Sequence, residues 1–147
     1  MQSFASMPRG AAVWLVPVLC GMLLQGCAQK PGPQVAQPRL FASDFQGAAK
    51  SCKAPKPSLS PGKDTAAEMT VGNDGGWCAI EVADEGKPYA AGLLTEQSAH
   101  GDVYIHPVGN TTRIDYTPDS GFTGNDAFAV RLLPGDPVLR VSVTVTR

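Results

Sequence analysis

The sequence predicts an all-β fold, a two-layer sandwich of about seven strands. After residue 62 the chain divides into short segments of about five to nine residues, in which apolar and polar side chains tend to alternate. Clusters of Gly, Pro, Asn and Asp separate these segments and favour turns. No stretch of this region keeps the 3.6-residue apolar period of a long helix.

Seven segments are expected to form the strands. They are Glu68–Gly72, Trp77–Ala83, Tyr89–Thr95, Asp102–Pro107, Thr112–Thr117, Asp126–Leu132 and Val138–Thr146. Asn73-Asp74-Gly75-Gly76 is a strong hairpin signal between the first two. Pro134-Gly135-Asp136-Pro137 predicts a turn between the last two.

Alternation within three of these segments also predicts which side chains face the core, because successive residues of a strand point to opposite faces. The expected inward sets are Leu139, Val141, Val143 and Val145; Phe128, Val130 and Leu132; and Cys78, Ile80 and Val82.

The stretch from Tyr116 to Phe128 predicts two strands joined by a stiff, packed connection. Pro118 cannot donate to a ladder and should end the first strand. Gly121 and Gly124 permit backbone angles that a Cβ would forbid. Phe122 and Phe128 supply two large apolar anchors.

This stretch, read as Tyr-Thr-Pro, Gly-Phe-Thr-Gly and Asp-x-Phe, resembles the motif of bacterial Ig-like, cadherin-like repeat domains. His100-Gly101-Asp102-Val103 resembles a strand start of the same family, and the likeness covers roughly residues 65 to 147. It implies an Ig-like sandwich in which Tyr116, Phe122 and Phe128 are core residues and Asp126 is a turn acceptor. Two features depart from the family: the domain is single, and the calcium motif Asp-x-Asn-Asp of cadherins is absent.

The N-terminus resembles a bacterial lipoprotein signal peptide, residues 1–26. Arg9 precedes an apolar stretch from Ala11 to Leu24, which is short for a membrane span and suits a signal sequence. The following Leu24-Gln25-Gly26-Cys27 resembles a lipobox, which implies lipidation of Cys27. The residue after this cysteine is Ala28 and not Asp, which resembles the pattern of lipoproteins that are sorted to the outer membrane. The alternative interpretations are an ordinary signal peptide and a hydrophobic terminus with a chance Gly-Cys.

Residues 27–61 are expected to form a lipidated, proline-rich tether, followed by the sandwich at 62–147. From Ala28 to Lys63 there are six Lys or Arg and one acidic residue. Residues 64–147 carry five Lys or Arg and 12 acidic residues. The basic tether either contacts anionic headgroups or is a solvated linker, and we favour the linker. Leu40–Phe45 is its one apolar interruption. It is either a short docking element, a single turn resting on the domain or an unordered stretch, and we favour the last two. The acidic domain argues against nucleic-acid binding.

The four cysteines fit an exported protein. Cys20 leaves with the signal peptide and Cys27 is lipidated, so Cys52 and Cys78 remain as an expected disulfide. Closing that loop would stabilise the fold by about 3.5 kcal/mol in the chain-entropy model. Two free thiols are the alternative.

The sequence offers little chemistry, and we expect no enzyme, no metal and no cofactor. His100, Asp102 and His106 share one strand face, but the two histidines would lie about 20 Å apart, too far for one ion. The acidic pairs Asp84/Glu85 and Asp119/Asp126 lie in turns. Trp77 and Tyr104 are either exposed binding aromatics or partly buried, Trp77 under the tether.

These observations predict a lipid-anchored protein of the bacterial cell envelope, at the periplasmic face of the outer membrane. Its domain is expected to bind or brace another envelope protein or a glycan without catalysis. One alternative is a periplasmic inhibitor of a hydrolase, with a loop such as Gly86–Ala91 entering the enzyme's active site. A metal-assisted enzyme is the third.

Overall fold

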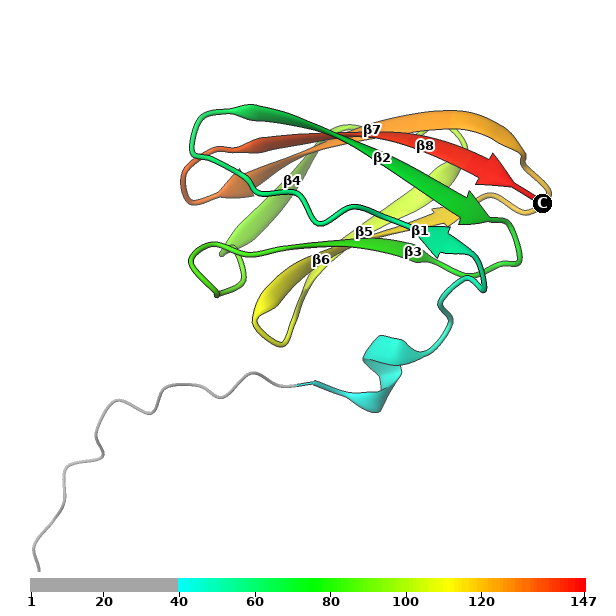
Figure 1. Ribbon diagram of the computed structural model, residues 1–147, viewed down its shortest axis with the longest axis horizontal. Coiled ribbons are helices and arrows are strands. Elements are labelled where there is room, and N and C mark those ends of the chain that lie inside the picture. The colour runs from blue at the N-terminus through cyan, green and yellow to red at the C-terminus, as the bar shows by residue number, and fades with distance from the viewer. Residues whose placement is uncertain (1–39) are drawn as a thin grey trace, which may run out of the picture. The chain divides into compact units, whose positions relative to one another are not determined.

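Two β-sheets face each other and enclose one core, which confirms the predicted all-β sandwich (Figure 1). The computed structural model describes residues 40–147, so the predicted signal peptide and Cys27 lie outside the described residues. The elements are the 3₁₀ turn η1 (Ala42–Phe45) and the strands β1 (Cys52–Lys53), β2 (Asp64–Gly72), β3 (Cys78–Val82), β4 (Ala91–Glu96), β5 (Gly101–Val108), β6 (Thr111–Pro118), β7 (Gly124–Leu133) and β8 (Val138–Thr146). All seven expected strands are present, with ends that differ by a few residues.

The larger sheet has the order β1-β2-β8-β7-β4 and the smaller one β3-β6-β5. Neighbouring strands are antiparallel except β2 and β8, which run parallel over their whole length. The inward sets expected from alternation are buried in both sheets. Among the described residues, no helix is long and apolar enough to cross a membrane.

The turn at Asn73–Gly76 is not a hairpin, which corrects the expectation. β2 and β3 belong to different sheets, so this turn carries the chain across the sandwich. Asn73 donates from its side chain to the carbonyls of Asp119 and Phe122, at 2.7 and 2.9 Å. An Asp-Gly turn signal specifies local backbone angles, and these serve an inter-sheet crossing as well as a hairpin.

Part of the predicted tether is folded onto the sandwich. β1 pairs with β2, and Cys52 is bonded to Cys78 of the opposite sheet, which confirms the predicted disulfide. Ala49 is buried in the core, and Leu59 packs against it. The packed region therefore begins before residue 62. Small, scattered apolar residues among prolines and lysines do not reveal this packing in the sequence.

The stretch from Tyr116 to Phe128 also joins the two sheets. β6 ends at Pro118 as expected, and Tyr116 and Phe128 are fully buried. Their rings stack with centroids 5.9 Å apart. Phe122 is only half-buried, so it belongs to the edge of the core. Gly124 has a φ of +140°, a conformation that L side chains rarely adopt.

Candidate functional site

The outer face of the smaller sheet carries a cluster of aromatic and charged side chains. It comprises Trp77, Tyr104, His106, Arg113 and Asp115, and we call it the Tyr104 face. Register places Tyr104 beside Asp115 and His106 beside Arg113 on neighbouring strands. Their side chains alternate with the inward residues of β5 and β6, so they project away from the core.

Arg113 and Asp115 form a buried ion pair at the centre of this face. Arg113 Nε donates to Asp115 Oδ1 at 2.8 Å, and Nη2 donates to Oδ2 at 2.9 Å. The two side chains are only 6% and 8% exposed. A bidentate guanidinium–carboxylate pair has a fixed geometry, so it holds both groups rigidly.

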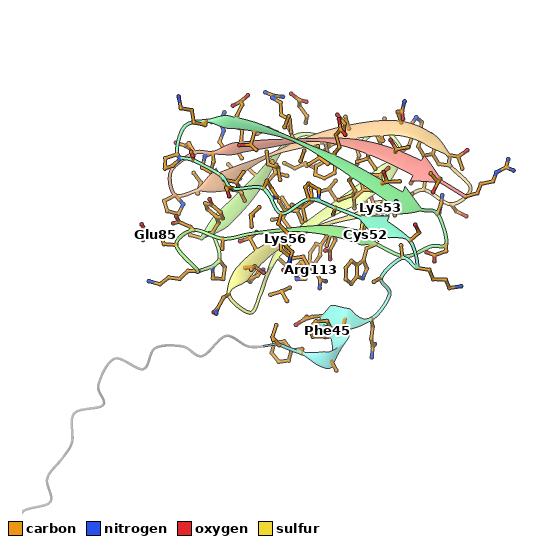
Figure 2. The ribbon with its side chains drawn as sticks, viewed as in Figure 1. Phe45, Cys52, Lys53, Lys56, Glu85 and Arg113 are labelled. Carbon is orange, nitrogen blue, oxygen red and sulfur yellow. A yellow bond between two sulfur atoms is a disulfide. The ribbon has the colours of Figure 1, made fainter. Side chains whose placement is uncertain are left out.

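Residues 40–49, which we call the strap, cover part of this face. Arg113 Nη1 donates to the backbone carbonyl of Asp44, and the guanidinium lies 4.1 Å from the centre of the Trp77 ring. Figure 2 shows Arg113 on the side of the sheet where η1 lies. The Trp77 indole donates to the Gln46 carbonyl at 2.9 Å. Trp77 is therefore partly buried under the end of the tether, and Leu40–Phe45 does include a single turn resting on the domain.

Tyr104 is the exposed part of the face, with 63% of its surface accessible. Its ring stacks on His106 with centroids 4.5 Å apart. His106 Nε2 lies 3.1 Å from Asp115 Oδ2, so the carboxylate orients the imidazole as well as the guanidinium. The cluster thus supports an exposed tyrosine on a rigid polar base, an arrangement suited to recognition.

The candidate residues His100, Asp102 and His106 are not brought to one site. His100 stacks on Phe122, with ring centroids 4.1 Å apart, whereas His106 is engaged with Asp115. Within residues 40–147, no three His, Cys, Asp or Glu side chains lie close enough to hold one metal ion.

Comparison with known proteins adds no family to this geometry. No protein-family model matches the chain, and no curated protein matches it. The resemblance to Ig-like repeats therefore stays a prediction from the motif residues.

The acidic pair Asp84/Glu85 lies at the tip of the β3–β4 connection, where Figure 2 labels Glu85. Asp84 and Lys87 exchange two backbone hydrogen bonds of 2.8 and 2.9 Å, which close a tight turn. Beside it lies an open cavity of about 380 Å³. Its lining residues include Asp84, Glu85, Tyr89 and Pro134.

Asp126 is the centre of a hydrogen-bond network. Its carboxylate accepts the amides of Ala99 and His100, each at 2.9 Å, and the Tyr116 hydroxyl at 2.8 Å. The role of turn acceptor is thus confirmed, but the turn is the neighbouring β4–β5 connection. Burial opposes the charge of Asp126, yet these hydrogen bonds outweigh it and lower its pKa below the ordinary value. Burial, followed by the bond to Asp126, raises the pKa of Tyr116.

The lowered pKa of Asp126 predicts a pH-dependent contribution to stability. A carboxylate whose pKa is lower in the folded state stabilises the fold above its ordinary pKa, near 3.8, and this stabilisation disappears as pH falls through the lowered value. Asp126→Asn should therefore melt well below wild type at pH 7, by about 1–3 kcal/mol of lost hydrogen bonding. The difference should shrink on acidification below pH 3.8. Thermal melts of both proteins across pH 7 to 2 measure this, and a constant difference would contradict it.

Sequence reasoning found Trp77, Tyr104 and His106 individually but missed Arg113 and Asp115. In β6 they alternate with apolar residues, and such polar positions normally face solvent. The strap and the neighbouring aromatic side chains bury them instead. Two opposite charges two residues apart on one strand are the only sequence signal of this pair.

Proposed function

We propose that this chain is a non-catalytic lipoprotein of the bacterial cell envelope, whose Ig-like sandwich binds or braces another envelope protein or a glycan. The contact surface is the Tyr104 face. The observation that carries this proposal is an exposed tyrosine held on the His106–Asp115–Arg113 base. Tyr, Trp and Arg are the residues most enriched at the energetic centres of protein interfaces.

Rigidity is the physical advantage of this face. An interface side chain that is already ordered loses little rotamer entropy when the partner binds. Tyr104 also offers a flat apolar ring for a sugar or an aliphatic side chain, and a hydroxyl for a hydrogen bond. The same chemistry thus serves a protein or a glycan.

Substituting Tyr104 by alanine should weaken partner binding by about thirtyfold or more, the loss typical of an interface hot spot. The melting temperature should stay near that of wild type because the ring is largely exposed. The measurement is a pulldown from envelope extract with the soluble domain, followed by titration of the captured partner. Leu93→Ala is the matched control, since Leu93 is 50% exposed on β4 of the other sheet. Equal capture by the Tyr104 and Leu93 variants would contradict the assignment of this face.

The alternative, inhibition of a periplasmic hydrolase, is favoured by the closed turn at Asp84–Lys87. Inhibitory loops need a fixed shape, and two backbone hydrogen bonds supply one here. Tyr89 is buried, so only the first part of the expected Gly86–Ala91 loop would enter an active site. A secreted hydrolase as the main captured partner would favour this alternative, whereas an envelope structural protein or glycan would favour the Tyr104 face.

Lipid anchoring at Cys27 belongs to the same proposal, at the periplasmic face of the outer membrane. Its support is the order of Arg9, the apolar stretch and Leu24-Gln25-Gly26-Cys27. Cys27→Ser should release the protein from the membrane fraction or leave it unprocessed. Cell fractionation with immunoblotting measures this, and wild-type fractionation and migration of the variant would refute the anchor.

A further inference from the structure

The strap displays large apolar side chains to solvent although its backbone is docked on the sheet. Leu40, Phe41 and Phe45 are 60%, 57% and 66% exposed, in a stretch of six residues. They account for three of the five large hydrophobic residues exposed in the described chain, the others being Leu93 and Tyr104. Apolar side chains gathered at one exposed place usually mark a contact site.

Backbone contacts fix this arrangement. The carbonyls of Asp44 and Gln46 accept bonds from Arg113 and Trp77, and Trp77 also exchanges two backbone hydrogen bonds with the strap, of 3.0 and 2.8 Å. Asp44 closes the turn by accepting the Phe41 amide at 2.7 Å. Figure 2 shows Phe45 on the turn at the edge of the described domain. The strap is therefore held through its polar groups, and its apolar side chains remain free for another surface.

Positive charge follows the apolar turn directly. Lys50, Lys53 and Lys56 are all exposed, on the segment that leads through β1. Residues 64–147 carry five Lys or Arg against 12 acids, so an anionic surface would attract this segment and repel the rest of the domain. Exposed aromatic and aliphatic groups beside lysines are the composition of a membrane-surface contact.

The length of the preceding chain allows this contact. Leu40 lies 13 positions after Cys27, a span of at most about 45 Å when fully extended. We propose that the strap with its flanking lysines is a second membrane contact, which rests on anionic phospholipid headgroups and orients the sandwich on the bilayer. This inference rests on the proposed envelope location, because it needs a bilayer within reach of the turn.

The test uses soluble protein comprising residues 28–147, without signal peptide or lipid. The buried core residues and the disulfide lie within residues 40–147, so this chain is expected to fold alone. It is sedimented with vesicles of phosphatidylglycerol and phosphatidylcholine, or of phosphatidylcholine only. We expect binding to the anionic vesicles that weakens with added salt, and little binding to the neutral ones.

Two variants separate the two parts of the contact. Replacing Lys50, Lys53 and Lys56 by glutamine should weaken anionic binding by about a hundredfold, since each lysine near such a surface contributes about fivefold. Replacing Leu40, Phe41 and Phe45 by serine should weaken it by about tenfold or more. Leu93→Ser is the matched control and should bind as wild type does. Thermal melts should be unchanged in all three, because these side chains lie outside the core.

Failure of either part is decisive. The proposal is overturned if wild type does not sediment with anionic vesicles, or if either the triple glutamine variant or the triple serine variant sediments as wild type does. Capture of a soluble protein through Leu40, Phe41 and Phe45, without vesicle binding, would also overturn it. Because this chain lacks Cys27, the result is independent of lipidation, which the fractionation of Cys27→Ser tests separately.

Discussion

Replacing Phe128 by alanine should leave the sandwich marginally stable or unfolded. The ring is 1% exposed at the centre of β7, and it stacks on Tyr116 of the opposite sheet. Removing such a ring from a core costs about 3–5 kcal/mol, through lost burial and the cavity left behind. The total stability of a domain of this size is roughly 5–15 kcal/mol. Thermal and urea unfolding of the soluble domain measure the loss.

Phe45→Ala is the matched control for this substitution. It removes the same atoms from a side chain that is 66% exposed on the strap, so its melt should stay close to that of wild type. Phe122→Ala should fall between the two, because Phe122 is half-buried and stacks on His100. If Phe128→Ala melts within a degree or two of wild type, the ring is not a core residue, and the role that the Ig-like motif implies for Phe128 is wrong.

The strands were predictable because each has one face in the core. In β8, Leu139, Val141, Val143 and Val145 alternate with polar residues, and this alternation specifies both the strand and its inner face. Their partners were not predictable, since alternation says nothing about which strand lies beside which. The parallel pairing of β2 with β8 joins residues more than 70 positions apart, as Asp64 opposite Val138 shows.

The N-terminal part of the domain shows a second limit of prediction from sequence. β1 has only two residues, too few for any periodicity, and it is held by its pairing with β2 and by the bond from Cys52 to Cys78. Cysteine count and compartment predicted the bond but not the strand. A covalent link of this kind can order a polar segment whose own composition indicates an open tether.

The candidate site was predictable only in part, for a related reason. Tyr104 and Trp77 were recognised as candidate binding aromatics. Arg113 and Asp115 were not, because the strap that buries them is distant in sequence, with Asp44 nearly seventy residues before Arg113. Burial of a polar strand face therefore depends on a tertiary contact that strand periodicity does not contain.

Breaking the buried pair of Arg113 and Asp115 should have the second large effect on stability. Arg113→Ala should destabilise the domain by about 3–5 kcal/mol, because it leaves the buried Asp115 carboxylate without its bidentate donor. It also removes the cation that stacks on Trp77 and the donor to the Asp44 carbonyl. Hydrogen exchange at residues 41–48 should therefore rise by more than the global loss explains. Urea unfolding and exchange mass spectrometry measure the two effects.

Replacing both partners distinguishes a buried pair from a hydrated one. Because a well-packed apolar pair often substitutes for a buried ion pair at little cost, Arg113→Met combined with Asp115→Leu should recover much of the stability that Arg113→Ala loses. The double variant should still exchange rapidly at residues 41–48, since methionine cannot donate to the Asp44 carbonyl. A loss below about 1 kcal/mol for Arg113→Ala would mean that water replaces the guanidinium and that the pair behaves as an exposed one. In that case the base beneath Tyr104 is not rigid, and the preorganisation that favours the Tyr104 face as a binding surface is lost with it.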